Sequence, residues 1–185
     1  MTGKAQPRGG LLADRLRMAM WGGAALLFLL PLAAMQLGDE VEWDAADFIL
    51  VGAMLGVGCG AVELAARRRA GLAYEAAVGF AVAAAFLTVF ANGAVGIIGD
   101  EGNPVNLLYF AVPALALVGG AIARFRPGGM AAAMAVAAGV QVLAGLAGVA
   151  LVPDYRGLLI GTALFTPLWL LSAWLFAKAE RELSS

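Results

Sequence analysis

Long apolar runs separated by short polar connections dominate this chain. Six runs reach the length of about 20 residues that lets a helix cross a bilayer core of about 30 Å. The alternation of apolar and polar positions that is typical of a membrane β-barrel does not occur in these runs. The pattern therefore predicts an all-α fold, a six-helix transmembrane bundle with short loops. We expect this bundle to form a single transmembrane domain over 1–185, with helices at about 18–37, 46–66, 75–99, 106–125, 129–152 and 157–177.

The first apolar run, Met18 to Leu37, follows a basic stretch, as the core of a secretory signal peptide does. At about 20 residues this run exceeds the 7–15 residues of a signal core. We therefore interpret it as a retained first transmembrane helix.

The distribution of basic residues predicts the orientation of the bundle. Of 12 Lys and Arg residues, 11 fall in the N-terminal tail, the second and fourth loops and the C-terminal tail, which share one side. Only Arg156 falls on the other side. Because basic loops are retained in the cytoplasm, we expect both termini to be cytoplasmic, in a multi-pass protein of the bacterial inner (cytoplasmic) membrane.

Composition excludes several kinds of chemistry. Hydrophobic residues make up 62% of the 185 positions and charged residues 14%, histidine is absent, and Cys59 is the only cysteine. These counts exclude an internal disulfide, bis-histidine haem, the usual zinc and iron–sulfur sites, and nucleophiles that are activated by histidine. A net charge of −1 does not favour a nucleic-acid partner. We expect no catalytic residues, no metal site, no cofactor and no enzymatic activity.

Three polar side chains within the predicted spans are candidates for a functional role. Glu63 is four residues before Arg67, so one helix face carries both, and an ion pair at the interface is the alternative to a proton or cation site. Asn92 and Gln141 are deep and neutral. Each forms either an interhelical hydrogen bond or part of a polar path.

Acidic residues gather in the predicted outer loops, with Asp39, Glu40, Glu42 and Asp44 in the first of them. Their spacing matches no calcium-binding loop. Orientation bias alone also leaves acidic residues outside, so these residues do not predict a metal site.

The segment Phe90 to Phe110 reads FANGAVGIIGDEGNPVNLLYF, and Ala123 to Pro127 and Leu168 to Phe176 accompany it. Together these segments resemble a group of small, uncharacterised bacterial multi-pass inner-membrane proteins. The resemblance implies a membrane fold and no particular activity. It singles out a hairpin that contains Asn92, Asp100, Glu101, Asn103, Pro104 and Asn106. This hairpin is either an active outer surface or a hydrogen-bonded turn in which Asp100 or Asn103 caps a helix.

Two classes of function remain. The first is a non-catalytic accessory or scaffold subunit, or a homo-oligomer, which contacts membrane lipid and either other membrane subunits or further copies of itself. The glycines at 52, 56 and 60 mark a face for helix packing within the bundle or between copies. The second is a small solute or ion transporter or channel. It would need a water-accessible cavity at Asn92, Gln141 or Glu63, whereas pairing of these side chains with neighbouring helices would favour the first class.

Overall fold

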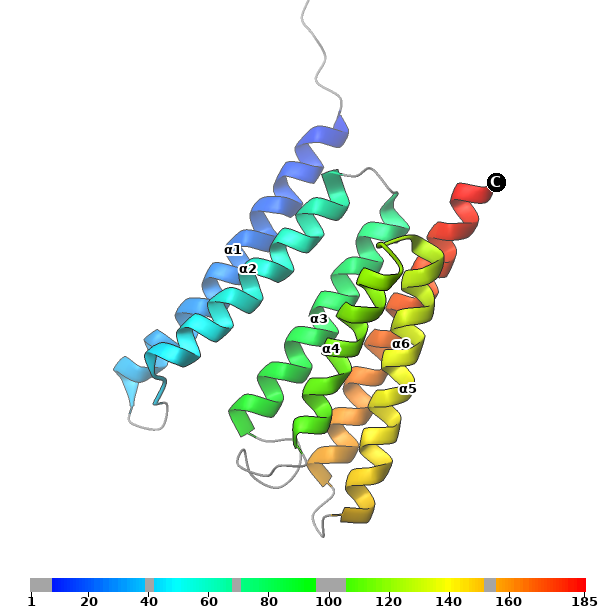
Figure 1. Cartoon of the computed structure of the whole chain (residues 1–185). Coiled ribbons are helices and arrows are strands. Elements are labelled where there is room, and N and C mark those ends of the chain that lie inside the picture. The colour runs from blue at the N-terminus through cyan, green and yellow to red at the C-terminus, as the bar shows by residue number, and fades with distance from the viewer. Residues whose placement is uncertain (1–7, 39–41, 68–70, 96–105, 152–155) are drawn as a thin grey trace, which may run out of the picture. The chain divides into compact units, whose positions relative to one another are not determined.

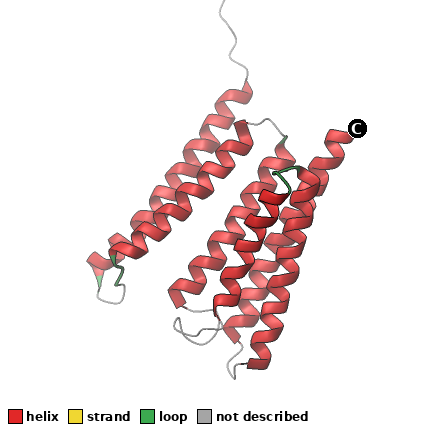
Figure 2. Cartoon of the chain, in the orientation of Figure 1, coloured by secondary structure: helices red, strands yellow, loops and turns green. Residues whose placement is uncertain are grey.

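A computed structural model describes residues 8–38, 42–67, 71–95, 106–151 and 156–185. All regular secondary structure in these ranges is helical (Figure 2). Figure 1 labels the six helices, which are α1 (Arg8–Leu37), α2 (Ala45–Arg67), α3 (Leu72–Val95), α4 (Leu107–Ile122), α5 (Pro127–Leu151) and α6 (Arg156–Ser184). The predicted all-α fold is confirmed for these ranges.

Five of the helices are long and apolar enough to cross a membrane, and α4, with 16 residues, is shorter. The chain thus has the helices of a multi-pass membrane protein. The five segments are Asp14–Leu37, Ala45–Arg67, Leu72–Gly93, Pro127–Ala150 and Arg156–Ser184.

Several helices extend beyond the predicted apolar runs, because hydropathy marks only the apolar part of a helix. Helix α1 begins at Arg8, ten residues before the predicted start, and α6 continues through polar residues to Ser184. Helix α3 begins at Leu72 and α5 at Pro127, where proline suits the first turn because its missing N–H would have no partner there.

Helix α4 ends earlier than predicted, at Ile122. The next residues turn back, and Arg124 and Phe125 have positive φ angles of 52° and 57°. The Phe125 N–H donates to the Gly120 carbonyl at 3.0 Å, which closes the end of the helix. Left-handed backbone at non-glycine residues carries strain of about 1–2 kcal/mol each, so neighbouring contacts must hold this turn in place.

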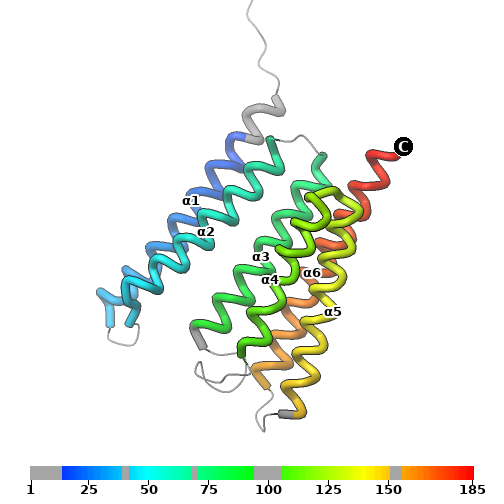
Figure 3. Tube along the Cα trace, in the orientation of Figure 1, coloured from blue at the N-terminus to red at the C-terminus, as the bar shows by residue number. Residues whose placement is uncertain are grey.

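Contacts along the chain group into two compact units, Met1–Glu63 and Leu64–Ser185, and each is described by itself. The second unit contains α3 to α6. Consecutive helices there run in opposite directions (Figure 3), and each helix packs on two others, α3 on α4 and α6, and α5 on α4 and α6. These four helices form a closed bundle with a shared interior.

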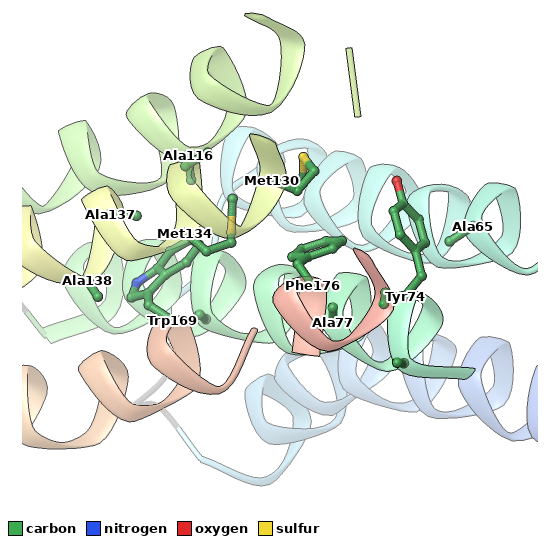
Figure 4. Close-up of a cluster of buried hydrophobic side chains, with 14 of the residues drawn as sticks. Ala65, Tyr74, Ala77, Ala116, Met130, Met134, Ala137, Ala138, Trp169 and Phe176 are labelled. Atoms are coloured by element: carbon green, nitrogen blue, oxygen red, sulfur yellow. The ribbon is translucent and has the colours of Figure 1, made fainter. Parts of the chain in front are cut away.

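The interior of the second unit holds two apolar clusters. The larger combines many alanines with a few large side chains, among them Tyr74, Met134, Trp169 and Phe176 (Figure 4). The smaller is built from Tyr109, Ala144, Leu158 and Phe165. Small residues allow the helix backbones to approach closely, which stabilises helix pairs in lipid, where apolar burial itself contributes little.

The first unit contains the hairpin of α1 with most of α2. Phe28 on α1 packs over Gly52, where an added β-carbon would lie 3.1 Å from its ring, and edge-on against Phe48, with ring centroids 5.6 Å apart. None of the apolar span of α1 is buried, so large apolar side chains such as Leu26 and Leu29 are exposed. A surface of this kind is suited to lipid or to another membrane helix.

In the described part of the acidic stretch before α2, two carboxylates cap the start of that helix. Asp44 Oδ1 accepts hydrogen bonds from the N–H groups of Ala46 (2.7 Å) and Asp47 (3.0 Å). Asp47 Oδ2 in turn accepts from the Asp44 N–H at 3.0 Å. This reciprocal arrangement satisfies free donors at the helix start, which gives both carboxylates a function without a cation.

Candidate functional site: polar contacts between the helices

Glu63 forms an ion pair that joins the two helices of the first unit. Arg17 Nε on α1 donates to Glu63 Oε2 on α2 at 2.6 Å. The Glu63 side chain is 15% exposed and the Arg17 side chain 44%, so the pair reaches the surface. An ion pair with Arg67 on the same helix was one of the two alternatives that the sequence left for Glu63; the pair with Arg17 links two different helices.

Asn92 forms the interhelical hydrogen bond that was one of its two predicted roles. Its Nδ2 donates to the carbonyl oxygen of Asn106 at 2.9 Å, and both residues are buried. Asn106 directly precedes α4 and makes no side-chain capping bond. Asn92 and Asn106 thus fix the end of α3 to the start of α4.

The other members of this hairpin that the sequence singled out, Asp100, Glu101, Asn103 and Pro104, lie outside the described residues. Among the residues that are described, no group of three or more His, Cys, Asp or Glu side chains could hold a metal ion.

Two further contacts cross the four-helix bundle. The hydroxyls of Tyr109 on α4 and Thr162 on α6 are hydrogen bonded at 3.2 Å. Ser172 Oγ on α6 donates to the carbonyl of Ala77 on α3 at 2.8 Å, and Ser172 is fully buried. The sequence did not predict these contacts of Thr162 and Ser172, because a serine or threonine in a helix can bond to its own backbone equally well.

The strained turn between α4 and α5 is held from both neighbouring helices. The Tyr74 hydroxyl on α3 donates to the carbonyl of Phe125 at 2.8 Å. Glu180 Oε2 on α6 accepts from the Gly128 N–H at 3.0 Å, and the Glu180 side chain occupies the space beside the missing β-carbon of Gly128. The sequence contained no signal for these two partners.

Gln141 differs from Asn92 and Glu63. It is fully buried on α5, and neither polar atom of its amide has a hydrogen-bond partner among the described residues. The same holds for the hydroxyls of Thr88 on α3 and Thr166 on α6 and for Trp169 Nε1 on α6. Unlike Asn92, Gln141 makes no hydrogen bond to another helix among the described residues.

Comparison of the chain with protein-family models, with curated proteins and with solved structures gives no match. The arrangement of the polar side chains is therefore the basis for a functional proposal.

Proposed function

We propose that this protein is a non-catalytic integral inner-membrane protein that serves as an accessory or scaffold subunit, or forms a homo-oligomer. One observation supports this proposal above others: Glu63 and Asn92, two of the three polar side chains that were candidates for a transport path, are engaged in contacts between helices. Glu63 pairs with Arg17, and Asn92 bonds the Asn106 carbonyl. Side chains engaged in this way stabilise one arrangement of helices and are not available to line a path for a solute.

The surface of the first unit supports a role in assembly. The span of α1 exposes its large apolar side chains, and on α2 a β-carbon added at Gly56 or Gly60 would meet no described atom within 4 Å. Small residues on an open helix face permit close approach of another membrane helix. The unequal distribution of basic residues supports a bacterial inner-membrane location with both termini in the cytoplasm.

The first test is extraction of the tagged protein from its native membranes in mild detergent, followed by native mass measurement and identification of co-purifying chains. We expect either larger membrane subunits in fixed ratio or a defined multiple of this chain. A monomer that emerges alone in several mild detergents would refute the proposal.

A pair of matched variants locates the contact surface. Gly56→Leu fills an apolar groove between α1 and α2, which Gly56 lines together with Trp21 and Phe28. Gly139→Leu places the same side chain at an exposed position of α5 that also has no described atom within 4 Å. We expect Gly56→Leu to dissociate the complex and Gly139→Leu to leave it intact. Unchanged assembly in both variants would place the contact on another face.

A small transporter or channel is the second candidate, because neither amide atom of the buried Gln141 has a hydrogen-bond partner among the described residues. Flux measurements in liposomes distinguish it from the first proposal, with Gln141→Leu as the variant that should abolish transport.

A further inference from the structure

A layer of polar groups separates the two apolar clusters of the four-helix unit. On α5 the larger cluster extends to Ala138 and the smaller one begins at Ala144, and Gln141 lies between them. On α6 Thr166 follows Phe165 of the smaller cluster and precedes Trp169 of the larger one. The polar residues therefore interrupt the apolar interior on both helices.

Contacts between α5 and α6 place Gln141 and Thr166 at the same depth. A β-carbon added at Gly145 would lie 2.5 Å from Thr162 Oγ1, so these two positions face each other. The helices are antiparallel, so one turn along each of them leads to Gln141 on α5 and to Thr166 on α6.

Helix α3 contributes Thr88 to this layer. The hydrogen bond from Ser172 to the Ala77 carbonyl aligns α3 with α6. Three turns further along the antiparallel pair, Thr88 lies within about one or two turns of Thr166. Thr88 is fully buried, which places its hydroxyl in the interior of the bundle.

Trp169 approaches the layer from the side of the larger cluster. Helical side chains lean toward the N-terminus of their helix, which for α6 is the direction of Thr166. Figure 4 shows the indole nitrogen of Trp169 on the side of Ala138, away from Phe176. Trp169 is 1% exposed, and its N–H has no hydrogen-bond partner among the described residues.

The chemistry of these groups defines what they would bind. Four side chains present five buried nitrogen and oxygen atoms without described partners. The threonine hydroxyls and the glutamine amide both donate and accept, and the indole only donates. None of these side chains is charged, and a buried polar atom without a partner is unfavourable. The layer thus suits a neutral molecule that both donates and accepts hydrogen bonds.

We propose that Thr88, Gln141, Thr166 and Trp169 form a buried binding site for a small neutral hydrogen-bonding molecule. The occupant is either water or a small amide or polyol solute. This inference goes beyond the proposed assembly role, which does not require such a site and is tested by a different measurement.

The indole N–H of Trp169 reports on occupancy. The variant Trp21→Phe, Trp43→Phe, Trp174→Phe retains Trp169 as its only tryptophan. This variant is reconstituted in liposomes and transferred from H₂O to D₂O. Its ultraviolet resonance Raman spectrum distinguishes hydrogen-bonded from free indole, and protonated from deuterated indole. We expect a hydrogen-bonded N–H that exchanges within minutes, because a bound neutral molecule exchanges with the solvent.

Two variants keep this test decisive. In this background Gln141→Leu, and independently the near-isosteric Thr88→Val, should shift the indole band toward the free position and slow exchange at least tenfold. A free N–H in the parent protein would overturn the proposal. So would a hydrogen-bonded N–H that stays protonated for hours, because that result would indicate a partner within the protein.

A second measurement distinguishes water from a small solute as the molecule bound in the site. Stopped-flow light scattering of proteoliposomes follows entry of urea and of glycerol. Entry at least fivefold faster than in protein-free liposomes, and lost in Gln141→Leu, identifies the solute. Entry at the protein-free rate, together with indole exchange, identifies water.

Discussion

A close approach of α4 to α5 permits a quantitative test of packing in the four-helix unit. Gly119 faces Ala133, and a β-carbon added at Gly119 would lie 2.8 Å from the β-carbon of Ala133. Carbon atoms in ordinary contact are about 3.5–4.0 Å apart, so Gly119→Ala forces the two helices apart by about 1 Å.

The expected magnitude follows from two opposing effects. Overpacking of this size costs about 1–3 kcal/mol, and alanine in place of glycine inside a helix contributes about 1 kcal/mol of stability. Gly119→Ala should therefore lower the free energy of unfolding by about 0–2 kcal/mol. In the double variant with Ala133→Gly the clashing methyl is gone, and the next atom, the α-carbon of residue 133, is 3.5 Å away. The coupling energy of this double-mutant cycle should reach about 1–3 kcal/mol.

Equilibrium unfolding in mixed micelles of increasing sodium dodecyl sulfate content, followed by circular dichroism, measures these free energies. Gly139→Ala on α5 is the control, because that glycine is exposed and a β-carbon there meets no described atom within 4 Å. It should be neutral or stabilising by up to about 1 kcal/mol. A coupling energy below about 0.5 kcal/mol, the range of independent sites, would refute the close approach of α4 and α5.

The remaining predictions concern single hydrogen bonds. Tyr74→Phe removes the donor to the Phe125 carbonyl and should lower the free energy of unfolding by about 1 kcal/mol in the same titration. Asn92→Leu removes the bond between α3 and α4 and should lower it by about 0.5–2 kcal/mol. Asp44→Ala removes the cap of α2 and should destabilise the helix start by about 0.5–2 kcal/mol, seen as faster amide hydrogen exchange at Ala46. An unchanged value in any of the three would contradict the assigned bond.

The apolar runs were sufficient to predict the helices, because lipid forces backbone groups to pair within each segment. They could not locate ends that lie outside the apolar region. Helix α1 begins at Arg8 and α6 ends at Ser184, both in polar sequence, where hydropathy gives no indication of a helix boundary. Arg124 and Phe125 adopt left-handed backbone without a glycine to indicate it, so the early end of α4 was not predictable from residue types.

For the polar residues, the sequence predicted the need for a partner but not its identity. An interhelical bond was one of the alternatives for Asn92, and its acceptor is a backbone carbonyl, which no sequence pattern marks. Arg67 was one candidate partner for Glu63, because spacing along one helix is known in advance. Its pairing with Arg17 depends on how α1 and α2 align, which tertiary packing sets.

Gln141 was open to the same two interpretations as Asn92 because both are neutral amides inside apolar runs. The structure separates them: one amide has an acceptor on the next helix, and the other has none among the described residues. That difference depends on which atoms surround each side chain, so it could not be obtained from spacing.

The unequal lengths of α4 and α6 have a consequence for the surrounding bilayer. At about 1.5 Å per residue, the 16 residues of α4 extend for about 24 Å and the 29 residues of α6 for about 43 Å. Leu107 and Ile122, at the two ends of α4, expose 67% and 78% of their surface. The last turns of α6 are polar, whereas the whole length of α4 is shorter than a hydrocarbon core of about 30 Å. A span that is shorter than the core is accommodated by local thinning of the bilayer. Acyl chains beside α4 should therefore be compressed and disordered, and shorter-chain phospholipids should accumulate along this helix.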